Sequence, residues 1–290
     1  MARVAIVGVG AIGGALAGLL ETTGRHELTL CTRRPLSQLI VTSPEGTVTV
    51  KARNLTEPAQ AEPVDWIIVA TKTYDAESAA RWFPGLSADG APVAIVQNGV
   101  EHRERFAPWV GAERLLPVII ECPVERTADG RVNVRASTVM KVEDAPLGHA
   151  FAALFVGAAA KVELVDDFQT AAWAKLCLNA VGALNALTLR PASVLWGQAM
   201  TRVALDMVAE CVAVGRAEGA PLDDSMGGQV MARYRSHPPD AVNSLLADRL
   251  AGRRMEIDAR NGVIVRKGEK HGIPTPLNRM AVAILDAVSS

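Results

Sequence analysis

The apolar positions of the first 32 residues fall into three short runs separated by glycines and polar residues. A β-branched run at 3–7 predicts a buried strand, the run at 15–20 predicts a helix that ends near Gly24, and 26–31 predicts a second strand. This order of strand, helix and strand predicts a β-α-β unit at the start of the chain.

Further apolar runs at 64–70 and 91–96 predict two more buried strands. Extended runs at 115–121 and 131–142, with a turn at Asp129-Gly130, are expected to continue the same sheet. We therefore predict an α/β domain over residues 1–166, built on a Rossmann-type, mostly parallel sheet.

From residue 168 onward the apolar spacing becomes helical. The long apolar stretch 170–189 predicts a helix that is buried on most sides, and the stretch 221–240 is polar. Asn243-Ser244 resembles an N-cap. The remaining helices are expected at 199–218, 245–250, from about 254, and at 276–288. The pattern predicts a second, all-α domain over residues 167–290.

Composition narrows the function classes. The chain has 290 residues, 49% of them hydrophobic and 21% charged, as in soluble globular proteins. A net charge of -1 and an aromatic content of 4% argue against a nucleic-acid partner. The apolar stretch 4–20 holds five glycines and is shorter than the roughly 20 residues of a membrane span, so no membrane partner is predicted.

The four cysteines lie far apart and form no C-x-x-C pair, so we predict no metal site. Cys177 and Cys211 fall in apolar helical patterns and are expected to be buried thiols. Such cysteine usage fits a reduced, cytoplasmic setting. The five histidines all fall near turns or polar stretches, and none is assigned a catalytic role.

The first predicted strand is followed directly by a G-x-G-x-x-G motif. In dinucleotide-binding proteins the first glycine allows a tight turn, the second lets the pyrophosphate approach the backbone, and the third lets the helix pack on the strand. Other nucleotide and methyl-donor enzymes share this motif, but its place between a strand and a helix favours a dinucleotide. The predicted cofactor-binding residues are Gly8, Val9, Gly10, Ala11, Ile12 and Gly13.

The end of the second strand bears on the choice of cofactor. An NAD site usually has a carboxylate here, but this strand runs into Thr32-Arg33-Arg34. A guanidinium can bind a 2′-phosphate, so the sequence favours NADP(H), with Arg33 nearest the strand end. The alternative is a solvent-exposed basic turn.

Lys72 and Asn98 follow the next two predicted strands. Ligands bind beyond the carboxyl ends of strands in open α/β sheets, so both side chains are candidates for cofactor or substrate binding. Each also has an ordinary interpretation, Lys72 as a surface lysine and Asn98 as a turn residue before Gly99.

Lys175 and Asn179 interrupt the apolar helix predicted at 170–189. Their i, i+4 spacing places them on one face, one turn apart. Burial favours the neutral form of a lysine, which suits a proton donor. Lys175 could instead extend to solvent from a helix edge. Glu256, in the helix expected from about 254, could simply be a first-turn carboxylate favoured by the helix dipole.

Several motifs together resemble the ketopantoate reductase (2-dehydropantoate 2-reductase) family, over nearly the whole chain. Besides the glycine motif they are Thr71-Lys72-Thr73, Gln97-Asn98-Gly99, Lys175-x-x-x-Asn179, Asn243-Ser244, Glu256-Ile257-Asp258 and His271-Gly272-Ile273-Pro274.

The resemblance implies hydride transfer from NADPH to the ketone of a 2-keto acid, with 2-dehydropantoate as the leading substrate and pantothenate biosynthesis as the setting. It implies Lys175 as general acid, with Glu256 orienting it and contacting the cofactor ribose. Lys72 would contact the cofactor, and Asn98 would bridge cofactor and substrate. Asn179, Asn243 and Ser244 would bind substrate. The apolar helices of the second domain could pack on a second copy, giving a possible homodimer.

The sequence departs from the family at Ala183, where a second asparagine is common. Asn185 lies two residues later, which places it about 120° from Asn179 around an ideal helix unless Gly182 allows a bulge. Two alternatives follow: an NADP-dependent reductase of another keto acid or an imine, and a non-enzymatic NADP-sensing protein. The lysine and glutamate argue against the sensor, because sensing needs no proton donor.

Overall fold

The computed structural model describes residues 1–289, and these form two compact units. One unit contains 1–97 and 102–168, and the other contains 98–101 and the described residues from 169 onward. The sequence predicted a single change of domain between 166 and 167. The structure shows in addition that the short segment Asn98–Glu101 packs with the helical unit, although the residue before it, Gln97, belongs to the sheet unit.

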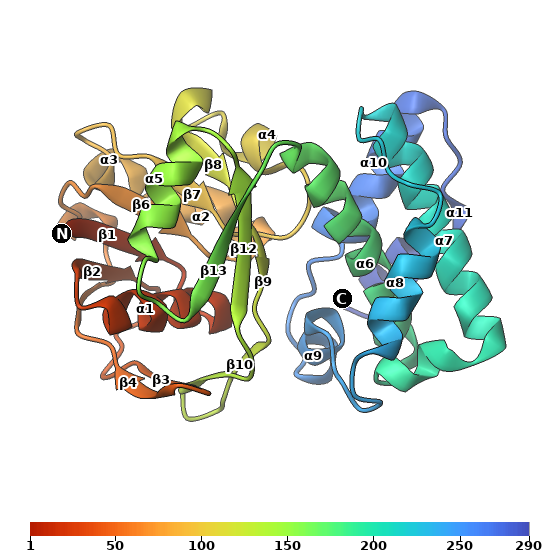
Figure 1. Cartoon of the computed structure of the whole chain (residues 1–290), viewed down its shortest axis with the longest axis horizontal. Helices are drawn as coiled ribbons and strands as arrows, with labels where there is room; N and C mark the ends of the chain where they lie inside the picture. Colours follow the sequence, from red (N-terminus) through yellow and green to blue (C-terminus); the bar gives the residue numbers. More distant parts are fainter. Residues whose placement is uncertain (290) are drawn as a thin grey trace. The chain divides into compact units, whose positions relative to one another are not determined.

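The first unit is organised around a six-stranded parallel sheet, as predicted (Figure 1). The strand order is β5-β2-β1-β6-β7-β8. The strand order therefore reverses between β1 and β6. In open parallel sheets ligands bind beyond the carboxyl ends of the strands at such a point. The strands are β1 (Ala2–Val7), β2 (His26–Cys31), β5 (Ala52–Leu55), β6 (Trp66–Val69), β7 (Val93–Ile95) and β8 (Leu115–Pro117).

Side chains of β1 alternate between two apolar cores, as the period of a strand requires. Val4 and Ile6 join the core that contains α1 (Ala11–Thr23), whereas Ala5 and Val7 join the core on the other face. That second face is covered by α2 (Ala76–Ala80), α3 (Phe83–Leu86) and α4 (His102–Phe106). Because both faces are covered, the central strands are apolar throughout.

The prediction that the later extended runs all continue this sheet is wrong. Only β8 does so. The other strands form two small sheets, β10-β11-β3-β4 and β13-β12-β9. Val132 of β11 and Val41 of β3 lie where side chains at Gly14 and Gly18 of α1 would be, so these glycines let the four-stranded sheet pack closely on the outer side of α1.

The remaining elements of this unit are short. The strands are β3 (Ile40–Ser43), β4 (Gly46–Thr49), β9 (Ile119–Glu121), β10 (Val124–Arg126), β11 (Val132–Val134), β12 (Thr138–Glu143) and β13 (Ala160–Val165). Helix α5 (Pro146–Leu154) was not predicted; its Phe151 packs edge-on against Trp66, with ring centroids 5.7 Å apart. Single 3-10 turns lie at η1 (Pro58–Gln60), η2 (Thr73–Asp75) and η3 (Ala112–Arg114).

The second unit is helical, as predicted, and its core is one apolar cluster around α6. Its helices are α6 (Phe168–Thr188), α7 (Gln198–Ala217), α8 (Met226–Arg235), α9 (Ser244–Leu250), α10 (Val263–His271) and α11 (Pro276–Ala287), with a 3-10 turn η4 (Ala192–Trp196). Helix α8 lies in the stretch that looked only polar. Its buried residues Met226, Val230 and Tyr234 repeat every fourth position, a stripe too sparse to stand out among polar neighbours.

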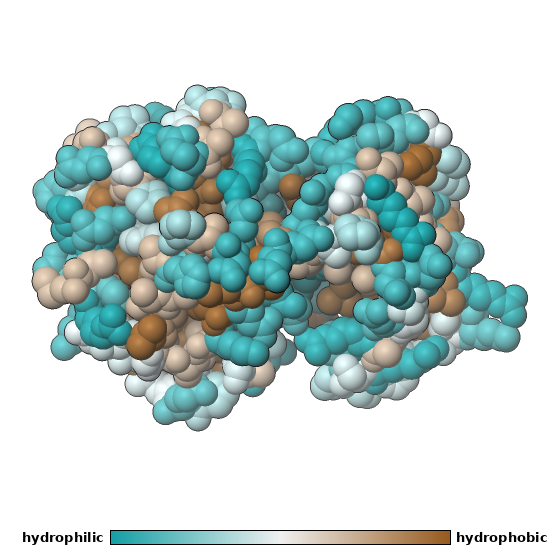
Figure 2. Space-filling view, turned by 45° about the horizontal axis from the view of Figure 1, so that its top comes forward, coloured by the Kyte–Doolittle hydropathy of each residue, from teal (hydrophilic) through white to brown (hydrophobic). Residues whose placement is uncertain are grey.

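The helix expected from about residue 254 begins differently. Met255 to Ile257 lead into a single π-helical turn, η5 (Asp258–Gly262), before α10 starts at Val263. Glu256 therefore is not an exposed first-turn carboxylate, and only 4% of it is exposed. Across residues 1–289, no helix is both long and apolar enough to cross a membrane. The face shown in Figure 2 is mainly hydrophilic, with apolar residues in small separate groups.

Candidate active site

The glycine motif forms the turn between β1 and α1. Gly8 has φ +93°, and a Cβ there would lie 2.6 Å from Thr71 Cγ2. A Cβ at Gly13 would collide with the Gly8 carbonyl oxygen. Gly10, in contrast, is exposed and has open space where a side chain would be. The turn is thus closed on its inner side and open at Gly10, next to the unpaired N–H groups that begin a helix.

Gln97 organises the neighbouring strand ends. Its side-chain Nε2 donates to the Thr71 carbonyl at 3.1 Å and to the Lys72 carbonyl at 3.3 Å. These bonds tie the turn after β6 to the end of β7 and fix the backbone that carries Lys72. The sequence singled out Lys72 and Asn98 but gave Gln97 no role of its own.

Arg33 lies just beyond β2, as expected from its position. Its side chain is 83% exposed, and its guanidinium lies 3.8 Å from the Asp75 carboxylate. Such an exposed pair is weak, so the guanidinium can exchange partners at little cost. The structure provides a cation at this strand end, and the residues that directly follow β2, Thr32-Arg33-Arg34, include no carboxylate.

Arg126 is a cation that sequence reasoning missed. It ends β10, in the small sheet that packs on α1, and its guanidinium donates a hydrogen bond to the carbonyl of Val9. A second guanidinium is therefore held at the glycine turn itself. No local signal marks it, because more than a hundred residues separate it from the turn and the pairing of β10 and β11 brings it there.

In the helical unit, three predicted residues form one chain of hydrogen bonds. Asn179 Nδ2 donates to Asn98 Oδ1 at 3.3 Å, and Asn98 Nδ2 donates to Glu256 Oε2 at 3.1 Å. Lys175 lies one turn before Asn179 on α6, and both are half-buried. The carboxylate and two amides are thus gathered beside the face that carries the lysine.

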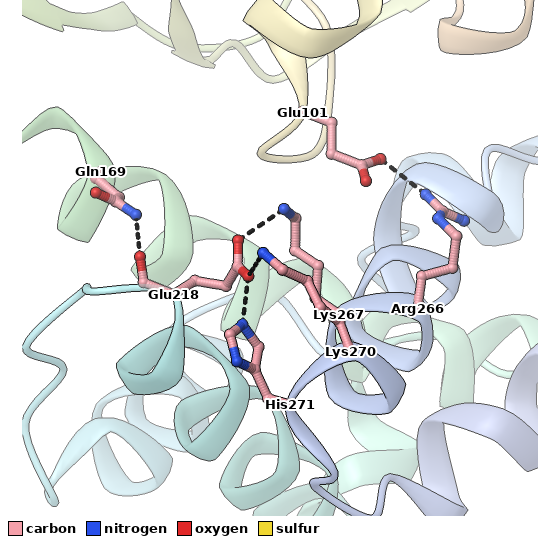
Figure 3. A network of polar contacts seen from close by, with 7 residues as sticks. All are labelled: Glu101, Gln169, Glu218, Arg266, Lys267, Lys270 and His271. Carbon is pink, nitrogen blue, oxygen red and sulfur yellow. Dashed lines mark hydrogen bonds and ion pairs between the residues drawn. The ribbon is translucent and has the colours of Figure 1, made fainter.

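Gly99 explains how Asn98 reaches this cluster. It has φ +98°, and a Cβ there would lie 2.6 Å from the Ala259 carbonyl oxygen in η5. Glu101 then pairs with Arg266 of α10 at 2.7 Å (Figure 3). The segment is held at both ends, which fixes the amide of Asn98 between Asn179 and Glu256.

Asn243 and Ser244 differ in what their side chains do. Asn243 Oδ1 accepts from the backbone N–H groups of Leu245 and Leu246, both at 3.0 Å, so it is the N-cap of α9. Its Nδ2 donates to the Gly182 carbonyl and to Asn185 Oδ1. Ser244 is exposed, and its Oγ accepts from Arg260 at 2.7 Å. Ser244 is therefore better placed than Asn243 to meet a ligand.

The bulge considered at Gly182 is wrong. Helix α6 runs unbroken from Phe168 to Thr188, and Asn185 is 1% exposed. Its Nδ2 donates to the carbonyls of Arg190 and Pro191, so this amide closes the end of the helix. Ala183 is fully buried. The asparagine that the family commonly has at this position is therefore not replaced by Asn185.

Burial shifts the pKa values of several titratable groups, among them His102 and Arg260. Burial lowers the pKa of His102 to about 4, although its ring hydrogen bonds to the Gln97 carbonyl at 2.9 Å. Burial also lowers the pKa of Arg260, against the opposing effect of the nearby Glu256.

Cys177 and Cys211 are fully buried, as predicted. Residues 1–289 contain no group of three or more potential metal ligands.

A parallel sheet with a glycine-rich nucleotide turn, followed by a helical unit with a lysine-asparagine face, is the construction of a two-domain dehydrogenase. Comparison with known proteins agrees: residues 4–146 match the ketopantoate reductase PanE/ApbA family and residues 167–289 match its C-terminal part. The chain therefore belongs to the ketopantoate reductase family.

Individual relatives support this membership. The chain is 48% identical to a 2-dehydropantoate 2-reductase of Caulobacter vibrioides, over all of both chains. Among solved structures it resembles a PanE/ApbA family ketopantoate reductase from Ralstonia eutropha JMP134, with 32% identity, a TM-score of 0.88, and coverage of 99% and 98%. A D-mandelate dehydrogenase solved with NADH and anilino(oxo)acetate has the same fold, with a TM-score of 0.89 at 21% identity and coverage of 99% and 98%.

Proposed function

We propose that this chain reduces a 2-keto acid, with 2-dehydropantoate as the first candidate, to the 2-hydroxy acid by hydride transfer from NADPH. The observation that carries the proposal is the hydrogen-bonded chain Asn179–Asn98–Glu256 beside Lys175. The 48% identity to a 2-dehydropantoate 2-reductase of Caulobacter vibrioides supports the choice of substrate.

The residues of the sheet unit fit a dinucleotide. The open side of the turn at Gly10 admits a pyrophosphate, and the start of α1 offers N–H groups to it. Arg126 adds positive charge at the same turn, and Lys72 lies at the end of the next strand. NADPH, when bound, supplies the hydride.

The preference for NADP over NAD rests on Arg33. A 2′-phosphate binds an exposed guanidinium well, and the weak contact with Asp75 is easily given up. The D-mandelate dehydrogenase of the same fold was solved with NADH, so the fold alone does not decide the cofactor.

Lys175 is the proposed general acid. A ketone oxygen gains negative charge as the hydride arrives, and a nearby ammonium stabilises that charge before it gives up its proton. The buried carboxylate of Glu256 would orient this ammonium and would contact the cofactor ribose. Asn98 would bridge the cofactor and the substrate, and Asn179 would bind the substrate. The hydrogen bond between these two amides already holds both side chains in place.

Ser244 is the better candidate for the substrate carboxylate. Its hydroxyl is exposed and already accepts one hydrogen bond, so its proton is available to a ligand. Asn243 was predicted for the same task. Its amide is engaged at both ends in the fold, and a substrate contact would have to compete with the cap of α9. We therefore propose that Asn243 affects substrate binding indirectly, because it caps α9 and so positions Ser244.

The four cysteines form no disulfides and three of them are buried, which fits a cytoplasmic enzyme, the setting we propose. The test is a panel of 2-keto acids with NADPH and with NADH, followed by loss of absorbance at 340 nm. We expect turnover with 2-dehydropantoate and a higher kcat/KM with NADPH. Tight NADPH binding without turnover of any keto acid would favour the sensing protein instead.

A second candidate substrate is a bulkier or more apolar keto acid, or an imine. Buried Ala183 favours it, because the asparagine that could meet a substrate hydroxyl is missing and Asn185 does not take its place. Leaving that hydroxyl unpaired would cost about 1–3 kcal/mol. A kcat/KM for an apolar keto acid well above that for 2-dehydropantoate would support this alternative.

A further inference from the structure

Arg260 is a buried guanidinium next to two of the proposed site residues. Only 4% of it is exposed, and arginine is rarely buried so fully unless it is paired. It lies in the π-helical turn η5, four residues after Glu256. Turns of this kind are frequent at functional sites, where they redirect a side chain.

In the π-helical turn the side chains of Arg260 and Asn261 point to different elements. The Gly262 N–H bonds to the Ile257 carbonyl at 3.0 Å, an i to i+5 spacing. Asn261 is fully buried and donates to the Ala180 carbonyl at 3.1 Å. Arg260 points instead to α9, where its terminal nitrogen donates to Ser244 Oγ at 2.7 Å.

The residues around the Arg260 guanidinium leave one of its nitrogen atoms without a hydrogen-bond partner. Glu256, Asp248 and Tyr234 are the charged or titratable groups that act on it. The Asp248 carboxylate is already paired with Arg253 at 2.9 Å. Among the described residues, the buried Nε of Arg260 has no hydrogen-bond partner. Positive charge is thus held directly behind an exposed hydroxyl.

The direction of the bond to Ser244 matters for binding. A hydroxyl has one proton and two lone pairs. Since Arg260 can only donate, Ser244 must accept, and its own proton is left to be donated to a different acceptor. A carboxylate oxygen is the acceptor that this proton and the charge behind it would both favour.

We propose that Arg260 is a positioning and specificity residue, which holds Ser244 as a hydrogen-bond donor and makes the site selective for substrates that carry a carboxylate. This inference rests on the proposed reduction of a 2-keto acid. It adds a residue outside the lysine-asparagine face and states which functional group of the substrate the site selects.

The experiment compares the wild type with Arg260→Gln, Arg260→Lys, Ser244→Ala and the double variant Arg260→Gln/Ser244→Ala. Each is assayed with a 2-keto acid and with the corresponding neutral 2-keto amide. For Arg260→Gln we expect the keto acid KM to rise at least tenfold, with kcat and the NADPH KM changed less than threefold. The keto amide KM should change little. Arg260→Lys should recover part of the loss, because the charge remains.

The double variant separates positioning from a general effect on the fold. If Arg260 acts through Ser244, Arg260→Gln should raise the keto acid KM by a much smaller factor in the Ser244→Ala background than in the wild type. Equal factors in both backgrounds, or equal losses for acid and amide, would overturn the proposal. If Arg260→Gln does not fold, Arg260→Lys decides: an unchanged keto acid KM would overturn it.

Failure of the proposed function has a different signature. A wild-type protein that turns over no 2-keto acid would refute the reductase assignment before any variant is compared. A wild type that is active, with Arg260 variants that bind the keto acid normally, would refute only the inference on Arg260.

Discussion

Glu218 offers the sharpest test of how the helical unit is held together. It lies at the end of α7, and two lysine ammonium groups and one histidine ring of α10 contact its carboxylate (Figure 3). Lys267 is at 2.7 Å, Lys270 at 2.9 Å and His271 at 2.5 Å. Burial alone would raise the pKa of Glu218, but the hydrogen bonds from these side chains outweigh it and lower the pKa to about 2.

The magnitude follows from this shift. A fall in pKa from the ordinary 4.5 to about 2 corresponds to about 3 kcal/mol of native-state stabilisation. Because the folded pKa is depressed, the stabilisation is complete above the unfolded pKa and is lost as the pH falls through about 2. Glu218→Gln should therefore lower the free energy of unfolding by about 1–3 kcal/mol at pH 7.

The assay is urea unfolding of the full chain at pH 7 and pH 4. The difference between the wild type and Glu218→Gln should shrink by about 1 kcal/mol at the lower pH, since the unfolded carboxylate then takes up a proton. Glu269→Gln is the matched control, on the helix α10 that carries the three partners of Glu218. It removes an exposed pair with Arg279 and should cost less than about 1 kcal/mol. Equal, pH-independent costs for the two variants would refute the reasoning.

Three further predictions concern the site. Arg33→Gln should raise the KM for NADPH about tenfold, roughly 1.4 kcal/mol, and leave that for NADH nearly unchanged; equal effects on both cofactors would contradict a 2′-phosphate contact. Arg126→Gln, which removes charge at the glycine turn, should raise the KM for NADPH and NADH alike, and an effect on NADPH alone would contradict its place at the pyrophosphate. Asn243→Ala should lower the free energy of unfolding by about 1 kcal/mol through loss of the α9 cap, as urea titration would show; an unchanged stability with a raised keto acid KM would favour direct substrate binding.

Much of the sheet unit could be predicted from the sequence because its signals are local. The strand 26–31 was predicted with the bounds of β2, and Gly24 ends α1 with φ +62°, as a C-terminal glycine should. The four-stranded sheet could not be predicted, because β3 and β11 are separated by about ninety residues and only their pairing reveals it. Arg126 was missed for the same reason.

The helical unit shows the same division between local and distant signals. Asn243 was recognised as a cap from its neighbours, and the structure confirms this cap. Its place in substrate binding came only from resemblance and stays a prediction. The segment Asn98–Glu101 packs with the helical unit because Gly99 contacts Ala259 and Glu101 pairs with Arg266. The partners in each contact are far apart in the sequence, so no local signal predicts them.

The central claim is that Lys175 protonates the reduced ketone, and substitution of that lysine tests it most directly. Single-turnover reduction by NADPH should slow at least a hundredfold in Lys175→Ala, in the range expected for loss of a general acid, while NADPH binding stays within about threefold of the wild type. Lys161→Ala, at an exposed site on β13, should match the wild type in both. A Lys175→Ala protein that reduces the keto acid at the wild-type rate would contradict the account.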